Sequence, residues 1–218
     1  MTMQRAYPNE SAEYRRARNE LLQAEADLRA QIEAVAELRR ALPPGGLVGD
    51  VTFEGANGPI ALLDLFAPRH DSLILYSFMY GPDAEQECPM CSAFLDSANG
   101  QVKHISRRAA FAVVATSPYE RFAALAERRG WDQVTLLSSH GTDFAQKYHS
   151  EMPDGSQVPM CHVFVRSDDG VCHFWSSELL FEPSAWHPRH IDMLWPLWHY
   201  FDLLPEGRGD FMPSNDAG

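Results

Sequence analysis

Hydrophobic residues recur at every seventh position through the first part of the chain. They are Tyr14, Leu21, Leu28, Val35 and Leu42. With charged residues between them, this repeat predicts one amphipathic helix from Asn9 to Leu42, capped by Asn9 or Ser11 and stopped by Pro43-Pro44-Gly45-Gly46. Such a helix would be about 50 Å long, which exceeds the width of a small domain. We therefore expect it to lie across its own domain or against a second copy in a homodimer.

Short apolar runs alternate with amphipathic stretches in the rest of the chain. Strands are expected at 51–53, 60–62, 73–79, 111–116, 134–137, 163–166 and 171–175. Helices are expected at 92–107, 118–129 and 189–203. Turn residues at 55–58 and 167–170 make hairpins of the first two and the last two strands. This alternation predicts an α/β fold, with a helical arm at 9–46, a domain at 47–204 and a loose tail at 205–218.

Composition and charge narrow the class of partner. The 218 residues are 45% hydrophobic and 22% charged, which is ordinary for a soluble globular protein. A net charge of -12 argues against nucleic acid and against an anionic membrane surface. No apolar run is long enough to span a bilayer, and the first residues lack the apolar segment of a secretory signal. We therefore expect a cytoplasmic protein in a reducing compartment, where cysteines serve catalysis, redox sensing or metal binding more often than structure.

The sequence Cys88-Pro89-Met90-Cys91 lies between a predicted strand and a predicted helix. The N-terminus of a helix carries partial positive charge and free N–H groups, which stabilise a thiolate on Cys88. Cys91 lies one turn further on, where it can attack a mixed disulfide. This pattern predicts thiol–disulfide exchange, with Cys88 as the nucleophile and Cys91 as the resolving thiol. The partner would be a protein or small-molecule disulfide or thiol, and an external thiol system would supply electrons without a bound cofactor.

Two other functions fit the same cysteines. Cys88 and Cys91 could bind zinc together with Cys161 and His162 or with another histidine. The chain could also be a non-catalytic interaction protein that works through its long helix. Cys161 and Cys172 lie on the last hairpin, where a simple turn would put Cys161 opposite Ser176 and leave the two cysteines about 13 Å apart. That separation is too great for a disulfide, so we interpret them as small buried residues, with Cys161 as an alternative third thiol near the dithiol.

Ordered motifs over most of the chain support a family resemblance. They are Tyr14, Ala17-Arg18, Leu21-Leu22, Glu25, Leu28, Arg39-Arg40-Ala41-Leu42-Pro43, Leu75-Tyr76-Ser77-Phe78-Met79-Tyr80-Gly81-Pro82-Asp83, Cys88-Pro89-Met90-Cys91-Ser92, Gly130-Trp131, Ser138-Ser139-His140-Gly141-Thr142-Asp143-Phe144 and Leu203-Leu204-Pro205-Glu206-Gly207-Arg208. Together they resemble the bacterial thioredoxin-like family called domain of unknown function 899, a relative of the alkyl-hydroperoxide-reductase and thiol-specific-antioxidant group. The resemblance implies a thioredoxin-like fold, a central mixed sheet flanked by helices, after a long N-terminal helical arm. It implies no activity.

The chain departs from the related peroxidases around its first cysteine. Those enzymes place a proline and a threonine at fixed spacing ahead of one reactive cysteine, whereas Glu85 stands three residues before Cys88 and Pro82 is at a different distance. This departure argues against peroxide reduction by a lone cysteine. Glu85 and Glu87 would raise the pKa of the Cys88 thiol, while the helix N-terminus would lower it. We expect a dithiol of ordinary or weak nucleophilicity.

The fold analogy adds one expectation about the chain before the last hairpin. Thioredoxin-like folds place a cis-proline beside the C-x-x-C motif, and Val158-Pro159 occupies the corresponding place before a strand. We expect this bond to be cis and close to Cys88 and Cys91. Pro159 and the backbone of Val158 would then position the substrate.

Overall fold

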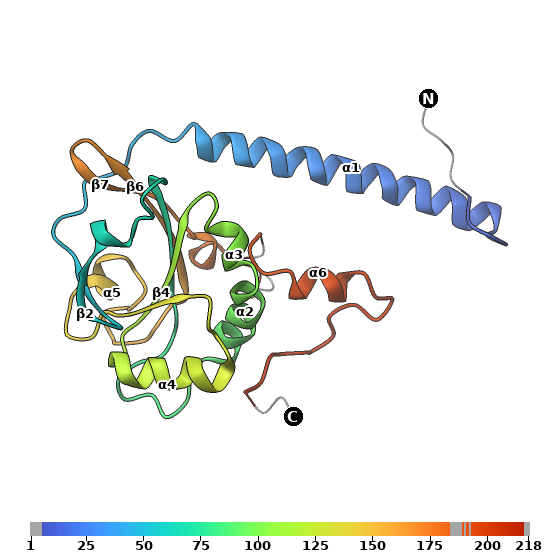
Figure 1. Cartoon of the computed structure of the whole chain (residues 1–218). Helices are drawn as coiled ribbons and strands as arrows, with labels where there is room; N and C mark the ends of the chain where they lie inside the picture. The colour runs from blue at the N-terminus through green and yellow to red at the C-terminus, as the bar shows by residue number, and fades with distance from the viewer. Residues whose placement is uncertain (1–5, 184–188, 190, 192, 216–218) are drawn as a thin grey trace. The chain divides into compact units, whose positions relative to one another are not determined.

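The computed structural model describes residues 6–183, 189, 191 and 193–215 (Figure 1). The chain divides into two units, Met1–Pro43 and Pro44–Gly218. The first unit contains the predicted helix, α1, which spans Ala12–Arg40. Ser11 caps it, because its hydroxyl accepts a hydrogen bond from the Tyr14 backbone N–H at 3.0 Å. No residue of α1 is buried, and Tyr14, Leu21 and Leu28 of its hydrophobic seam are exposed.

The second unit is built on a seven-stranded mixed sheet. Its strands are β1 (Thr52–Gly55), β2 (Gly58–Ala61), β3 (Ser72–Ser77), β4 (Ala110–Ala115), β5 (Thr135–Ser138), β6 (Met160–Ser167) and β7 (Gly170–Ser176). They lie in the order β2-β1-β5-β4-β3-β6-β7. The three central strands β3, β4 and β5 are parallel, and all other pairs are antiparallel. Both predicted hairpins are confirmed.

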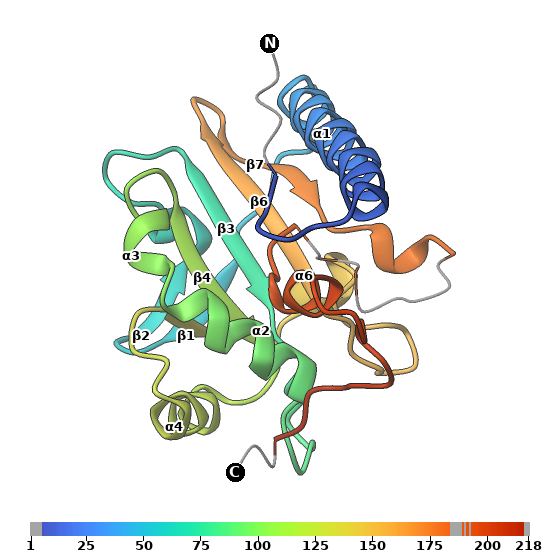
Figure 2. The same cartoon turned by 90° about the vertical axis from the view of Figure 1, so that its right-hand side faces the viewer.

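Helices cover both faces of this sheet. They are η1 (Leu62–Leu65), α2 (Pro89–Asn99), α3 (Val102–Ile105), α4 (Tyr119–Arg129), α5 (Phe144–Lys147), η2 (Leu179–Phe181) and α6 (Leu197–Asp202). One core cluster joins α2, α4 and α6 to the sheet through Tyr76 and Val113, and α2 lies across β3 and β4 in Figure 2. The other cluster joins η1 and α5 to the opposite face through Leu73 and Leu75. Neighbouring residues of β3 therefore point to opposite faces of the sheet and belong to different core clusters, as the two-residue period of a strand requires.

This arrangement is a thioredoxin-like fold, as predicted. Strand β3 leads through α2 and α3 into the parallel strand β4, and the chain ends its sheet with the antiparallel hairpin β6–β7. The arm helix at the N-terminus is also confirmed. None of the helices among the described residues is long and apolar enough to cross a membrane.

The helix predicted at 92–107 differs from the structure in two ways. It begins earlier, at Pro89, because proline suits the first helical position, where its missing N–H has no helical partner. It also breaks at Gly100, where glycine favours an end, and resumes as α3. The helix predicted at 189–203 is the short α6, although residues 190 and 192 of that prediction lie outside the described residues. The short helix α5 had no prediction.

A β-bulge shifts the pairing of the last hairpin. Val165 pairs with Cys172 as expected, but Phe164 pairs with His173 and Val163 with Trp175, which leaves an extra residue in β7. Ser176 consequently lies opposite His162. The prediction that Ser176 lies opposite Cys161 is wrong, because it assumed regular pairing of the two strands, without a bulge.

Candidate active site at the N-terminus of α2

Cys88 is the residue that caps α2. Its backbone is extended, and the helix begins directly after it at Pro89. The Cys88 carbonyl accepts the Ser92 N–H at 3.0 Å, and the Cys88 N–H donates to the Met79 carbonyl at 3.1 Å. The second bond closes the loop between β3 and α2 at its base. Cys88 is therefore held at the helix end, where the sequence predicts a reactive thiol.

Arg121 of α4 holds the loop before Cys88 from outside. Its guanidinium donates to the carbonyls of Gly81 at 3.1 Å, of Pro82 at 2.6 Å and of Ala84. It also lies over the Tyr80 ring, 4.4 Å from the centroid. One side chain thus supplies donors to three carbonyls of the loop. Arg121 could not be predicted from the sequence, because no motif links a residue of a later helix to this loop.

The C-terminal segment reaches the same loop. The Asn215 side-chain amide donates to the Glu87 carbonyl at 2.9 Å. Phe211 packs edge-on against Phe201, with ring centroids 5.0 Å apart. Figure 2 shows this segment returning from α6 toward the loop that precedes α2. The prediction of a loose tail is therefore wrong for residues 205–215, and residues 216–218 lie outside the described part.

The environment of Cys88 favours its thiolate. A hydrogen bond from the Cys91 thiol and the backbone N–H groups of Met90 and Cys91 lower the pKa of Cys88 from 9.0 to about 6, against the opposing effect of burial. Glu85 and Glu87 are not among the causes of the shift, and Glu85 is exposed. The expectation of ordinary or weak nucleophilicity allowed for a pKa raised by these carboxylates, and the lowered pKa argues against that effect. The N–H groups of α2 and the Cys91 thiol act on the sulfur directly, whereas Glu85 lies in solvent.

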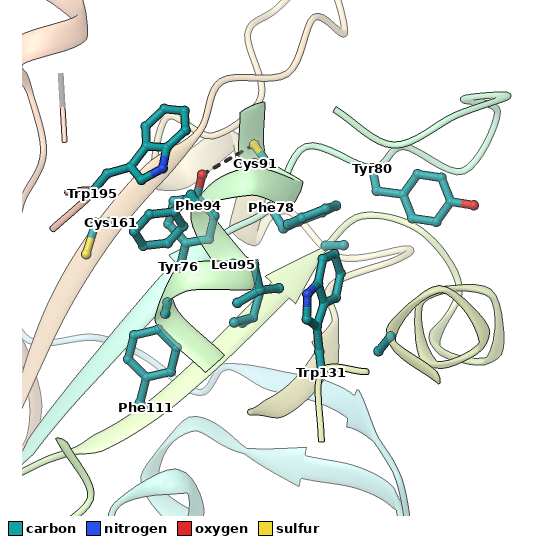
Figure 3. Packing of buried hydrophobic residues seen from close by; sticks show 14 of the residues in the cluster. Tyr76, Phe78, Tyr80, Cys91, Phe94, Leu95, Phe111, Trp131, Cys161 and Trp195 are labelled. Atoms are coloured by element: carbon teal, nitrogen blue, oxygen red, sulfur yellow. Dashed lines mark hydrogen bonds between the residues drawn. The ribbon is translucent and has the colours of Figure 1, made fainter. Parts of the chain in front are cut away.

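Cys91 is the opposite kind of thiol. It is 2% exposed, and burial together with the charge of Cys88 holds its pKa well above 9.0. The buried Tyr76 hydroxyl donates a hydrogen bond to the Cys91 sulfur at 3.3 Å, as the dashed line in Figure 3 shows. Cys88 is thus accessible and acidic, while Cys91 is enclosed and protonated in the reduced protein. These are the properties of an attacking thiol and a resolving thiol.

A cavity of about 240 Å³ opens beside the two cysteines. Its walls are Tyr76, Met79, Cys88, Met90, Cys91, Gln157, Pro159, Leu180, Ile191 and Trp195. None of these ten side chains is a carboxylate, lysine or arginine, and most are apolar. The cavity can therefore hold an apolar group attached to a sulfur atom that contacts Cys88.

The structure corrects the prediction about Val158-Pro159. The bond is trans, as are all peptide bonds among the described residues. The Val158 N–H already donates to the Ser150 carbonyl at 2.9 Å, so its backbone is held by the preceding loop. Pro159 does line the dithiol cavity, whereas Val158 lines a different, smaller one. The substrate-positioning role that rested on a cis bond loses its basis, and Pro159 remains as a wall residue.

The structure places Cys161 and His162, two of the expected zinc ligands, on opposite faces of the sheet. Cys161 belongs to the core under α2, while His162 packs against Phe144 and Tyr148 on the opposite face. Neighbouring residues of a strand point to opposite faces, so the two cannot join one metal. Among the described residues no group of three His, Cys, Asp or Glu side chains is placed to bind a metal ion.

The other two cysteines are not part of the dithiol cavity. Burial raises the pKa of Cys161 to about 12, which keeps its thiol protonated and unreactive. In Figure 3 its sulfur points away from the pair formed by Tyr76 and Cys91. Cys172 is half-buried and lies 3.7 Å from the Ser167 hydroxyl. All four cysteines are free thiols in this structure.

A larger cavity of about 920 Å³ lies by the ends of β6 and β7, and its walls include Leu47, Tyr148, His173, Ser176 and Glu178. The Ser176 hydroxyl lies 2.7 Å from both His162 Nδ1 and His173 Nε2. Burial lowers the pKa of His162 to about 3 and also lowers that of His173 below 6.5, so both rings are neutral at pH 7. The bulge in β7 brings this trio together, which explains why the sequence did not indicate it.

Comparison with known proteins gives one family and several distant structures. Residues 3–216 match the family described as bacterial protein of unknown function (DUF899). No curated protein matches the chain. An exposed lipoprotein thioredoxin from Streptococcus pneumoniae is 14% identical over 67% of this chain and 98% of its own, with a TM-score of 0.44. A peroxidoxin, BcpB, from Mycobacterium tuberculosis is 22% identical over 70% and 94%, with a TM-score of 0.47. A secreted disulfide oxidoreductase from the same species is 16% identical over 66% and 92%, with a TM-score of 0.40.

Proposed function

The chain belongs to this bacterial family of unknown function, and we propose that it is a thiol–disulfide oxidoreductase. One observation carries the proposal: an accessible thiol with a pKa of about 6 caps α2, and a buried thiol lies one turn away. At pH 7 most of Cys88 is then thiolate, which is the nucleophilic form. A structural pair of buried cysteines would have no cause for this asymmetry.

The reaction runs in two exchange steps. The Cys88 thiolate attacks one sulfur of a substrate disulfide, forms a mixed disulfide and releases the first substrate thiolate. Cys91 then loses its proton to solvent, attacks the Cys88 sulfur and releases the second substrate thiolate. The substrate is reduced by two electrons, and the protein is left with a Cys88–Cys91 disulfide. An external thiol restores the dithiol by the reverse sequence.

The cavity supports a substrate with an apolar group next to its sulfur. Among the described residues that line it there is no carboxylate, lysine or arginine, and the protein has a net charge of -12. An anionic disulfide would have to approach against this charge and lose its hydration in an apolar site. The Trp195 indole N–H is buried in the cavity wall with no acceptor among the described residues. A neutral disulfide that offers one acceptor to Trp195 fits these features best.

Turnover of a neutral aromatic disulfide by the reduced protein tests the proposal. The wild type should reduce it in the presence of an external dithiol, and Cys88→Ser should not. Cys91→Ser should retain the first step and accumulate the mixed disulfide. Cys172→Ser is the matched control, because it removes a half-buried thiol far from the cavity and should leave turnover unchanged. Equal turnover by Cys88→Ser would overturn the proposal, and a stoichiometric zinc ion in the purified protein would replace it with the metal site.

For the arm we propose a homodimer through α1. Tyr14, Leu21 and Leu28 are 51%, 53% and 61% exposed, and they repeat at the heptad interval that a two-stranded coiled coil requires. A second copy of the chain presents the same hydrophobic seam, so the two α1 helices can bury their seams against each other. Light scattering should give a dimer for the full chain and a monomer after deletion of the arm. A full-length monomer would exclude this interface.

A further inference from the structure

We propose that Tyr76 is a catalytic residue of the resolving step, in which its hydroxyl stabilises the Cys91 thiolate as it attacks the mixed disulfide. This role rests on the exchange function proposed above. It assigns chemistry to a strand residue outside the C-x-x-C motif.

The position of the hydroxyl is fixed by the sheet and by α2. Tyr76 lies in β3, where it pairs with Val113 and Cys161, and it is 1% exposed. Its ring packs on Phe94 of α2 with centroids 4.4 Å apart. Strand alternation points it at the face that α2 covers, so the hydroxyl meets the Cys91 sulfur at 3.3 Å. The contact is therefore built by two rigid elements rather than by a loop.

The groups around Cys91 act differently before and after the first exchange step. In the reduced protein, burial and the neighbouring Cys88 raise the pKa of Cys91, while Tyr76 and the Met79 N–H lower it. In the mixed disulfide Cys88 no longer carries a charge, so its effect on Cys91 disappears. Burial then opposes the thiolate, and the hydrogen bonds from Tyr76 and Met79 support it. The buried phenol itself keeps a pKa well above 10.0, so it stays protonated and acts as a donor.

The chemical step balances without a further reactant. The Cys91 proton passes to solvent, the Cys91 sulfur forms a bond to the Cys88 sulfur, and the bond between Cys88 and the substrate sulfur breaks. The substrate leaves as a thiolate. In the reverse direction, Cys91 is the leaving thiolate when an external thiol attacks Cys88. The same hydroxyl would stabilise it there.

Rapid mixing of the reduced protein with one equivalent of dithiodipyridine separates the two steps. The attack of Cys88 releases the first coloured thione, and the attack of Cys91 releases the second. The experiment uses a Cys172→Ser background, so that the half-buried third thiol does not contribute. Tyr76→Phe keeps the ring packing and removes only the hydroxyl. It should leave the first phase within about twofold of wild type and slow the second about tenfold at pH 7, which corresponds to a rise of about one pKa unit at Cys91.

The pH profile gives a second readout that a packing defect would not move. The midpoint of the second phase should shift to higher pH in Tyr76→Phe, and its rate should approach that of wild type at alkaline pH. Tyr80→Phe is the matched control, since Tyr80 is also buried but points away from the cysteines in Figure 3. It should leave both phases and the midpoint unchanged.

The outcomes are distinguishable. Absence of a first phase in the wild type overturns the exchange function and this role with it. A normal first phase with an unchanged second phase in Tyr76→Phe overturns the role of Tyr76 and leaves the exchange function in place. Equal slowing of both phases, or slowing without a shift of the midpoint, assigns Tyr76 to packing and also overturns the proposal.

Discussion

The two cavities of this protein differ in size, face and chemistry. The dithiol cavity has a volume of about 240 Å³ and lies at the N-terminus of α2, while the larger cavity, of about 920 Å³, lies by the ends of β6 and β7. The larger cavity is lined by His173 and Ser176, and the Ser176 hydroxyl lies between His173 and the buried His162. Both histidines are poor bases because burial lowers their pKa. The smaller holds a thiol whose pKa is lowered to about 6.

The difference shows that volume is a poor guide to reactivity here. A helix terminus supplies N–H groups that favour an anion, and the dithiol cavity has one. Behind the wall residue Ser176 of the larger cavity, burial acts on His162 without a compensating charge, so the ring is neutral and serves as a structural hydrogen-bond partner. We therefore expect mutations in the dithiol cavity to change exchange activity and mutations in the larger cavity to change stability.

Replacement of Cys88 should have the largest effect. Cys88→Ser removes the nucleophile, and turnover of a neutral disulfide should fall by at least about 1,000-fold, in the range that loss of a catalytic nucleophile costs. Serine has nearly the shape of the half-buried thiol that it replaces, so the urea midpoint should stay close to that of wild type. Substantial residual turnover in this variant would assign the activity to another thiol.

The pH dependence of alkylation compares Cys88 with an ordinary thiol. Because the pKa of Cys88 is lowered to about 6, iodoacetamide should modify it at a nearly constant rate above pH 7. The rate should fall as the pH drops through about 6, where the thiolate is protonated. A midpoint near pH 9, the value of an ordinary thiol, would show that the helix end and the Cys91 thiol do not activate Cys88.

Arg121→Met tests how firmly the loop before Cys88 is held. The substitution keeps an apolar stem but removes the donor to the carbonyls of Gly81, Pro82 and Ala84. We expect a loss of about 1–3 kcal/mol in the free energy of unfolding, measured with urea, and slower alkylation of Cys88. Arg128→Met is the control, since Arg128 bonds a carbonyl of its own helix. Equal stability of both variants would show that Arg121 is not needed to hold the loop.

Ser176→Ala completes the comparison from the side of the larger cavity. It removes the shared partner of His162 and His173, and the buried His162 is left with the longer contact to Ser77 at 3.4 Å. The free energy of unfolding should fall by about 1–2 kcal/mol, while disulfide turnover should not change. A large loss of turnover would contradict the separation of the two cavities.

Local sequence patterns were enough to predict α1, both hairpins and the position of the dithiol. The heptad repeat located α1, the turn residues located both hairpins, and the strand–loop–C-x-x-C–helix order located the dithiol. Each of these depends on residues close in sequence. Gly130, which adopts a left-handed conformation with φ of 71°, ended α4 as expected for the same reason.

Features that depend on distant residues could not be predicted. Arg121 and Asn215 reach the loop before Cys88 from other parts of the chain, and Tyr76 reaches Cys91 only because α2 folds back over β3. The charge of Glu85 and Glu87 suggested an ordinary or weak nucleophile, because a sequence does not show which N–H groups contact the sulfur or that Glu85 lies in solvent. The cis bond expected at Val158-Pro159 came from fold analogy. The bond in the structure is trans, and the Val158 N–H is hydrogen-bonded to the preceding loop.

Thiol counting tests the central claim most directly. The reduced protein has four free thiols, and treatment with one equivalent of a neutral disulfide should leave two, with peptide mapping that places the new disulfide between Cys88 and Cys91. Reduction by a dithiol should restore all four thiols in the folded protein. Four thiols retained after treatment, or a disulfide that involves Cys161 or Cys172, would contradict an exchange reaction at the N-terminus of α2.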